Sequence, residues 1–266
     1  MSDQPVIGVL GAGGAVGSAV LAMLSGDRPR PGYRADFADL RAWCTGCQVV
    51  INCTGVQVAS EIHSGGAHYV DPSARPASGR RSGGEHVAVY DAGAMPGAIG
   101  LLPRLLATQL DEEPARLSVT AGGLYRFTPA SARDFLDTPD GWHAQATRVN
   151  HALGLRDSEW TTRFDGECVR RLLSSGTPTA EQLIAASRAD TAGRAQYLSI
   201  DAELTGTGGT VRQMRLRTGP DLTAATAIHC ARAVLVGEIP AGTHSADDVL
   251  DPVRVVPQLF GEEGSL

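Results

Sequence analysis

The chain has 266 residues, of which 42% are hydrophobic, and this length allows one large domain or two small ones with ample core. Its formal net charge is −6 and no block of basic residues stands out, which argues against a nucleic-acid-binding protein. No apolar run reaches the roughly 20 residues of a membrane helix, and no signal-peptide pattern is found, so we expect a soluble cytoplasmic protein.

The first predicted elements are a buried strand over Pro5–Leu10 and an apolar helix over Ala15–Leu24, joined by a glycine-rich turn. The turn has the spacing G-x-x-G-x-x-G with one additional glycine, and a G-x-G-x-x-G pattern fails because a valine takes its third glycine position. Glycines in such a turn let the backbone approach a pyrophosphate, and the helix N-terminus favours a phosphate. The turn therefore predicts a dinucleotide-binding domain with cofactor contacts from Gly11, Gly13, Gly14, Ala15, Val16 and Gly17.

The segment that follows is short for a domain of this kind. Ser25–Gly32 contains two prolines and two glycines and predicts a loop, whereas Tyr33–Asp36 predicts a short strand. A helix over Phe37–Cys44 then leads to a buried strand over Gln48–Asn52. An ordinary dinucleotide-binding domain places strand 2, a helix and strand 3 in this segment. We therefore expect a shortened Rossmann-like parallel sheet in which the strand 2 region is deleted and Tyr33–Asp36 is strand 3.

Because of this deletion, the sequence does not decide between NAD and NADP as the cofactor. Strand 2 normally ends in the acid that bonds the adenosine ribose of NAD, or leads to an arginine for the 2′-phosphate of NADP. No acid occupies that position here, and Arg28, Arg30 and Arg34 are candidates to bind the 2′-phosphate, although a loop of this composition is also typical of a solvated surface. The alternative is that dinucleotide affinity is weakened or lost.

Two further short strands, over Ala67–Val70 and Val87–Tyr90, precede a helix over Ala98–Gln109. Apolar strands that alternate with helices predict a parallel sheet covered on both faces. From about Ala115 the pattern changes to an inserted α+β unit with an antiparallel sheet. We expect a dinucleotide-binding domain over residues 1–114, completed by 220–266, and a substrate and dimerisation domain over residues 115–219.

The elements predicted for the inserted unit are a strand over Arg116–Ala121, helices over Gly141–Leu155, Glu159–Leu173 and Thr177–Ser187, and a hairpin of Gln196–Leu204 and Val211–Arg217. The long apolar helix Leu222–Val236 then returns to the first domain. Short helices are expected in Ser245–Phe260.

All 23 basic residues are arginine, which excludes several classes of chemistry. A Walker phosphate loop, a pyridoxal Schiff base, a lysine aldolase and the Tyr-x-x-x-Lys pair of short-chain dehydrogenases all need a lysine amine. Cys44 and Cys47 form a C-x-x-C pair, but no second pair or nearby histidine cluster completes a metal site. We interpret the pair as buried packing rather than redox chemistry, because it lies at a predicted helix end that leads into a buried strand. The histidines lack ligand spacing, so no metal site is expected.

Three motifs occur in order at the ends of successive predicted strands, where ligands bind in open parallel sheets. They are Asn52-Cys53-Thr54-Gly55, Tyr69-Val70-Asp71 and Met95-Pro96-Gly97. Together with the glycine turn they resemble the saccharopine dehydrogenase-like reductases over about residues 5–110. The resemblance implies an NAD(P)-binding domain interrupted by an α+β substrate domain. It also implies hydride exchange between NAD(P) and a C–N bond of an amino-acid-derived imine or secondary amine.

Carried over to this sequence, the resemblance implies that the glycine turn holds the pyrophosphate of the cofactor. The ribose and the nicotinamide would then lie over Asn52, Cys53, Thr54 and Gly55. The reacting carbon would be bordered by Tyr69, Asp71, Met95, Pro96 and Gly97.

The candidate acids follow two of these strands. A carboxyl group at Asp71 could protonate an amine nitrogen or bind a substrate cation, and Tyr69 shares its face because the two residues are two apart on a strand. Asp91 is a second candidate, and both acids could instead belong to turns or helix caps. In the inserted domain Tyr125 could donate a proton and Arg126 could bind a carboxylate, or both could serve packing and surface.

The leading hypothesis is an NADPH-dependent reductase of an imine, or of a related C=N or C=C bond, in a small carboxylated substrate. Asp71, Tyr69 or Tyr125 would supply the proton. One alternative is an enzyme that keeps the fold but has lost the dinucleotide and performs a cyclisation, elimination or hydrolysis; another is a non-catalytic partner protein. We also expect a homodimer, because the second sheet has an edge or face that needs covering.

Overall fold

The computed structural model describes residues 4–74, 84–137 and 143–260, which divide into two compact units. The first unit comprises Met1–Ala98 and Asp221–Asp251, and the second comprises Ile99–Pro220 and Pro252–Leu266. The second unit therefore begins before the expected boundary at residue 115. It also includes the C-terminal segment that we expected in the first domain.

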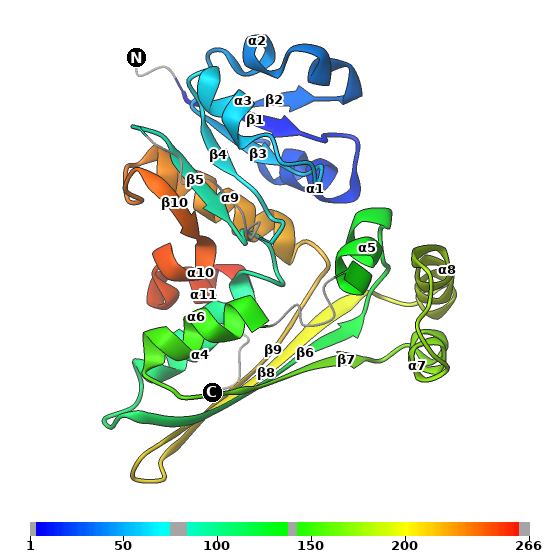
Figure 1. Cartoon of the computed structure of the whole chain (residues 1–266), viewed down its shortest axis with the longest axis vertical. Coiled ribbons are helices and arrows are strands. Elements are labelled where there is room, and N and C mark those ends of the chain that lie inside the picture. The colour runs from blue at the N-terminus through cyan, green and yellow to red at the C-terminus, as the bar shows by residue number, and fades with distance from the viewer. Residues whose placement is uncertain (1–3, 75–83, 138–142, 261–266) are drawn as a thin grey trace. The chain divides into compact units, whose positions relative to one another are not determined.

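Within the described residues, the first unit is built on a six-stranded parallel sheet (Figure 1). The strands have the order β10-β5-β4-β3-β1-β2 and comprise β1 (Val6–Leu10), β2 (Arg28–Gly32), β3 (Val49–Asn52), β4 (His68–Val70), β5 (Val87–Tyr90) and β10 (Gly242–Ser245). All four residues of β3 are buried, as expected for a parallel strand covered on both faces. The predicted α/β class with a parallel sheet is confirmed.

The helices of the first unit are α1 (Ala15–Met23), the 3-10 helix η1 (Arg34–Asp39), α2 (Leu40–Cys44), α3 (Ala59–Ser64), α9 (Leu222–Leu235) and α10 (Ala246–Val249). Helix α9 contacts α1, β3 and β4, so the long apolar helix returns to this unit as predicted. Strand β10, by contrast, was not predicted; it ends at Ser245, where the expected short helices begin.

Strand β2 corrects the prediction of a loop at Ser25–Gly32. It pairs in parallel with β1 along its whole length, from Val6↔Arg28 to Leu10↔Gly32. Proline has no N–H, so it is tolerated on an edge strand wherever that group would point away from the sheet. Pro29 and Pro31 are two residues apart on such an edge strand and therefore share one outward direction.

The position of β2 also corrects the prediction that strand 2 of the Rossmann order is deleted. Tyr33–Asp36 is not a strand, because η1 begins at Arg34. In the Rossmann order 3-2-1-4-5-6, the strand beside the first one on this side is strand 2. Strand β2 therefore takes the position of strand 2, and in the described residues the strand without a counterpart is the outer strand 3.

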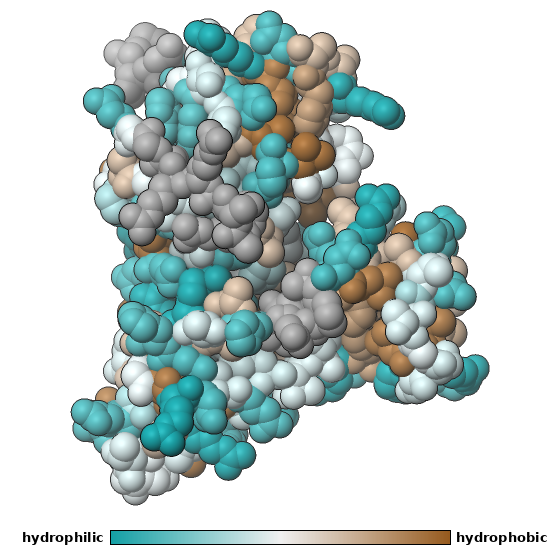
Figure 2. All heavy atoms as spheres, viewed as in Figure 1, coloured by the Kyte–Doolittle hydropathy of each residue, from teal (hydrophilic) through white to brown (hydrophobic). Residues whose placement is uncertain are grey.

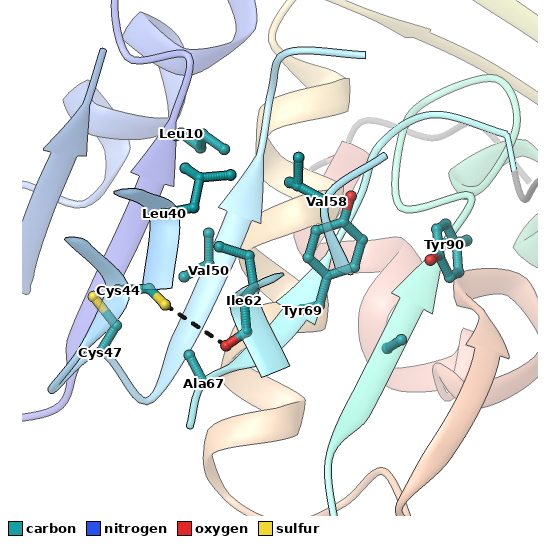
Figure 3. Close-up of a cluster of buried hydrophobic side chains, with 11 residues drawn as sticks. Leu10, Leu40, Cys44, Cys47, Val50, Val58, Ile62, Ala67, Tyr69 and Tyr90 are labelled. Atoms are coloured by element: carbon teal, nitrogen blue, oxygen red, sulfur yellow. Dashed lines mark hydrogen bonds between the residues drawn. The ribbon is translucent and has the colours of Figure 1, made fainter. Parts of the chain in front are cut away.

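One core cluster of this unit covers the face of the sheet toward α2 and α3 (Figure 3). Cys44 and Cys47 are both buried in it as free thiols, and the Cys44 thiol donates a hydrogen bond to the Ile62 carbonyl at 3.6 Å. Burial raises the pKa of both thiols, which disfavours the reactive thiolate. The interpretation of this C-x-x-C pair as core packing is confirmed.

The second unit contains a four-stranded sheet in the order β7-β6-β8-β9. Its strands are β6 (Pro114–Leu124), β7 (Glu159–Phe164), β8 (Tyr197–Gly206) and β9 (Val211–Thr218). Strands β6 and β7 are parallel, whereas β6–β8 and β8–β9 are antiparallel. The sheet is therefore mixed rather than antiparallel as predicted, and the predicted hairpin of β8 and β9 is confirmed.

The helices of the second unit are α4 (Ala98–Ala107), which begins at the last residue of the first unit, α5 (Pro129–Asp137), α6 (His143–Leu153), α7 (Glu167–Ser174), α8 (Ala180–Asp190) and α11 (Pro252–Phe260). The first two residues of the helix predicted over Gly141–Leu155 lie outside the described residues. Hydrophobic residues gather where α5, α7 and α8 lie, and they form a second core that includes Phe127 and Leu183 (Figure 2).

Two predictions in this unit are wrong in detail. Glu159–Leu173 is not one helix, because its first six residues form β7, with exposed and half-buried side chains in strict alternation. Helix α8 begins at Ala180 rather than at Thr177, and Thr179 is its N-cap. The Thr179 side chain accepts from the Gln182 N–H at 3.3 Å while the Gln182 side chain accepts from the Thr179 N–H at 2.8 Å. Among the described residues, none of the helices is both long and apolar enough to cross a membrane.

Candidate functional site

The glycine loop, residues 11–17, has a conformation that only glycine allows at two positions. Gly11 has φ +81°, and a Cβ there would lie 2.8 Å from Thr54 Cγ2 and 3.0 Å from the Cys53 carbonyl oxygen. A Cβ on Gly17 would lie 2.2 Å from the Gly11 carbonyl oxygen. The loop therefore packs directly against the residues that follow β3, which brings two of the predicted cofactor-binding segments together.

The N-terminus of α1 is open at this loop. Gly13, Gly14 and Ala15 are exposed, and Gly14 precedes the helix without a side-chain cap. The first N–H groups of an α-helix have no partner within the helix and carry the positive end of its dipole. The loop thus fits a bound pyrophosphate. Its glycines have no side chains that would clash with the phosphates, and its backbone N–H donors are accessible.

The end of β2 lies beside the same loop. The Gly32 carbonyl accepts from the N–H groups of Gly11 and Ala12, both at 3.0 Å. Tyr33 follows with 53% of its surface exposed, and its ring carbons lie 4.0 Å from the position of a Cβ on Gly13. Arg34 is exposed as well. Sequence reasoning named Arg34 as a candidate for the 2′-phosphate. It missed Tyr33 because it placed the strand over Tyr33–Asp36, after the residues that form it.

Arg28 and Arg30 lie away from the glycine loop. Arg28 pairs with Val6, at the opposite end of β1 from Gly11. The Arg30 guanidinium donates to the carbonyl oxygens of Trp43 at 2.8 Å and Thr45 at 2.7 Å, and it thereby satisfies the C-terminal end of α2. The structure therefore does not bring these two arginines together with the other residues predicted to bind the cofactor.

Asn52, Tyr69 and Asp71 form a buried hydrogen-bonded group at the carboxyl ends of β3 and β4, here called the strand-end network. The Tyr69 hydroxyl donates to Asp71 Oδ2 at 2.5 Å. The Asn52 amide donates to the same oxygen at 3.0 Å and to the Tyr69 oxygen at 2.7 Å, while Asp71 Oδ1 accepts from the Ser73 N–H at 2.8 Å. Tyr69 and Asp71 share a face, as the strand pattern predicts.

The strand-end network also holds the segment after β3. Asn52 Oδ1 accepts from the Thr54 hydroxyl at 2.7 Å and from its N–H at 3.3 Å, and Asn52 Nδ2 donates to the Val56 carbonyl at 2.8 Å. Thr54 is the residue whose methyl group lies against Gly11. The network therefore supports, through Asn52, the surface on which the glycine loop rests.

All three side chains of the network have zero exposure. Burial raises the pKa of the Asp71 carboxyl and of the Tyr69 hydroxyl, because a charge on either would be poorly solvated. Burial, together with the nearby Asp71 carboxyl, raises the pKa of the Cys53 thiol to about 12. Burial therefore works against the charged form of each of these groups, and none of the three network side chains is open to solvent.

The segment Asp91–Gly97 lies beside the network. The Asp91 N–H donates to the Ser73 carbonyl and the Ala92 N–H donates to the Asp71 carbonyl, both at 3.0 Å. Asp91 is 2% exposed and has φ +54°. Met95 and Pro96 are half-buried and are joined by a cis peptide bond. Three motifs read from the sequence, after β3, β4 and β5, thus converge at one edge of the sheet.

Tyr125 and Arg126 belong to the second unit. The Tyr125 ring packs in an aromatic cluster, with ring centroids 5.5 Å from Phe127 and 6.1 Å from Phe164. Burial raises the pKa of the Tyr125 hydroxyl. The Arg126 side chain is exposed, and its N–H donates to Gln196 Oε1 at 3.0 Å. Their roles toward a substrate stay predictions.

No protein-family model matches this chain, and none of the curated proteins compared with it matches its sequence. Among solved structures it is similar to a meso-dapdh mutant with DAP from Clostridium tetani E88, with 13% identity, 97% of both chains covered and a TM-score of 0.51. It is also similar to the apo histidine-tagged saccharopine dehydrogenase (L-Glu forming) from Saccharomyces cerevisiae, with 11% identity, 96% of this chain and 97% of that chain covered, and a TM-score of 0.57. At these identities the likeness shows the fold, which is Rossmann-type with a second, mixed-sheet unit.

Proposed function

We propose that this chain is an NADPH-dependent oxidoreductase that reduces a C=N bond of a small, carboxylated, amino-acid-derived substrate. The observation that carries the proposal is the open glycine loop beside the exposed Tyr33 and Arg34. Phosphate-binding backbone, an aromatic face and a guanidinium are the three features that an NADP dinucleotide needs at its adenosine end.

The residues take the following roles when a dinucleotide is bound. The N–H groups at the start of α1 bind the pyrophosphate, and the Arg34 guanidinium pairs with the 2′-phosphate. The exposed Tyr33 ring contacts the adenine. Residues 52–55, and the exposed Val56 beside them, lie under the ribose and the nicotinamide. The bound nicotinamide supplies the hydride for the reduction.

The strand-end network holds this surface in place in the proposal. Its complete burial favours a positioning role for Asp71 and Tyr69 over direct donation of a proton to the substrate. Tyr125 remains the candidate proton donor and Arg126 the candidate partner of the substrate carboxylate.

The substrate class has support from the two similar solved structures. One is named as a saccharopine dehydrogenase that forms L-Glu and the other was determined with DAP. The three strand-end motifs, which resemble those of saccharopine dehydrogenase-like reductases, lie at the edge of the sheet where such an enzyme would bind its nicotinamide.

The proposal is tested by titrating the purified chain with NADPH and with NADH and following cofactor fluorescence. NADPH should bind, and Gly14→Asp should abolish binding because it places a carboxylate at the phosphate position. Aspartate is a favourable residue before the first turn of a helix, so this variant should remain folded. If neither cofactor binds at millimolar concentration, the redox proposal is wrong and the fold serves a non-redox step or a binding role.

A further inference from the structure

The four-stranded sheet of the second unit has one buried face and one polar face. Leu117, Val119 and Ile200 are among the buried residues, and α4, α6 and α11 lie to one side of the sheet in Figure 1. The other face carries the alternate residues of each strand, most of which are polar or charged. Those of β7 and β9 are exposed, whereas most of those of β6 and β8 are half-buried or buried. A hollow of about 520 Å³ lies over this polar face, lined by residues that include Ser118, Thr120, Gln213 and Arg215.

The strand registers arrange the polar face in five rows that run across the strands. The central row is Thr161, Thr120, Asp201 and Arg215; one neighbouring row is Glu159, Ser118, Glu203 and Gln213; the other is Arg163, Gly122, Ser199 and Arg217. The outer rows are Arg116, Thr205 and Val211 on the first side, and Asp165, the buried Leu124 and Tyr197 on the second.

The charges of these rows are antisymmetric about the central row. Asp201 and Arg215 cancel in the centre, where they form an ion pair. The two carboxylates of Glu159 and Glu203 on one side match the two guanidinium groups of Arg163 and Arg217 on the other side. The outer rows continue the pattern, because Arg116 on the acidic side matches Asp165 on the basic side.

We propose that this polar face is the interface of a homodimer, with a second copy of the chain as its occupant. A two-fold axis that lies along the central row turns each acidic row onto a basic row of the partner, which is the isologous arrangement of a symmetric dimer. A rotation about this axis reverses the strand direction but leaves each strand at the same position across the sheet. Glu159 of β7 therefore faces Arg163 of the partner subunit, which is on the same strand at the other side of the central row. Glu203 faces the row that contains Arg217.

The size of the face fits a dimer of moderate strength. At about 4.8 Å between strands and about 3.4 Å per residue, the face covers roughly 600 Å² per copy. That area is near the lower end of specific interfaces, so charge matching has to contribute to the choice of partner. The hollow leaves room for the long arginine and glutamate side chains of the second copy.

The test is the oligomeric state of the full chain, measured by sedimentation velocity at low and at high salt. The wild type should sediment as a dimer that dissociates as salt rises. Glu159→Arg and Arg163→Glu should each weaken the dimer by about a hundredfold or more, because each variant places like charges opposite one another. An equimolar mixture of these two variants should form a heterodimer, since both contacts then join opposite charges.

Arg188→Glu, an exposed change of the same size on α8, is the matched control and should leave the dimer intact. Because Arg163 also pairs with Asp165 and Asp201 within the chain, Glu203→Arg provides a second test that leaves those ion pairs unchanged. A wild type that is monomeric throughout, or a dimer that survives all three variants, would overturn the proposal. Cofactor titration is unaffected by either result, so this inference and the proposed function fail independently.

Discussion

The Tyr69 hydroxyl and Asp71 Oδ2 share a 2.5 Å hydrogen bond in which neither side chain has any exposed surface. Two residues that the sequence marks as catalytic candidates therefore satisfy one another inside the protein. Asn52 completes the arrangement, because its amide donates to both and its carbonyl holds Thr54 beneath the glycine loop. The motif after β4 thus supports, through the motif after β3, the surface on which the glycine loop rests.

Tyr69→Phe should lower the free energy of unfolding by about 1–3 kcal/mol, because Asp71 loses a donor while it remains buried. It should also weaken NADPH binding, since the support of Thr54 through Asn52 becomes less rigid. Chemical denaturation and cofactor titration measure the two effects. Tyr33→Phe removes a hydroxyl from an exposed ring and should leave stability unchanged. Equal stability of Tyr69→Phe and the wild type would show that the network contributes little.

Asp71 should make the stability of the chain fall as pH rises. Burial raises the pKa of its carboxyl above the ordinary value of 3.8, so the folded chain holds this proton more tightly than the unfolded chain does. The associated stability is fully present below that ordinary value and is lost as pH rises through the raised pKa. Asp71→Asn should abolish this part of the pH dependence. Denaturation series at several pH values measure the slope, and parallel slopes for both proteins would contradict the assignment.

Periodicity predicts most of the parallel sheet, because β1, β3 and β5 are short apolar runs that end in polar or glycine residues. It fails at β2, where prolines and arginines predict a loop although the strand lies at an edge and needs neither an apolar face nor every N–H. It also fails at β7, whose alternation is carried by threonine, tryptophan and charged residues rather than by aliphatic ones.

The candidate site, like the sheet, is predicted in part from the sequence. The motifs after β3, β4 and β5 converge as expected, because the carboxyl ends of parallel strands meet at one edge. Burial could not be foreseen, since Asp71 and Asn52 are polar residues whose partners depend on the register of β3 against β4. Arg34 was among the arginines considered for the 2′-phosphate, whereas Tyr33 was missed because its place beside the glycine loop depends on where β2 ends.

Three histidines at the other end of the sheet should make the chain less stable in acid. The His63 and His86 rings stack at 5.2 Å, and the His68 and His86 rings are 5.8 Å apart. Burial lowers the pKa of His63 and of His68 below the ordinary value of 6.5, and the neighbouring His86 contributes in the same direction. The folded chain therefore binds these protons less tightly than the unfolded chain, and stability should fall as pH drops below 6.5.

His63→Gln should reduce this acid sensitivity, as measured by denaturation between neutral pH and the lowered pKa. His143→Gln, on an exposed position of α6, is the matched control and should keep the slope of the wild type. If both variants lose stability in acid as steeply as the wild type, His63 does not contribute.

Arg30, in the middle of β2, and Arg34, the first residue of η1, should separate stability from cofactor binding. Arg30→Ala removes the donor to the Trp43 and Thr45 carbonyls, so we expect a loss of about 1–2 kcal/mol in the free energy of unfolding. Cofactor affinity should not change, because Arg30 faces the end of α2.

Arg34→Ala should have the opposite effects. It should leave the free energy of unfolding unchanged and weaken NADPH binding by roughly 10- to 100-fold. NADH binding should be unchanged, because only NADPH carries the 2′-phosphate. Fluorescence titration with both cofactors measures this difference. Equal weakening of NADPH and NADH would place Arg34 outside the 2′-phosphate site, and an effect of Arg30→Ala on NADPH alone would restore the assignment made from the sequence.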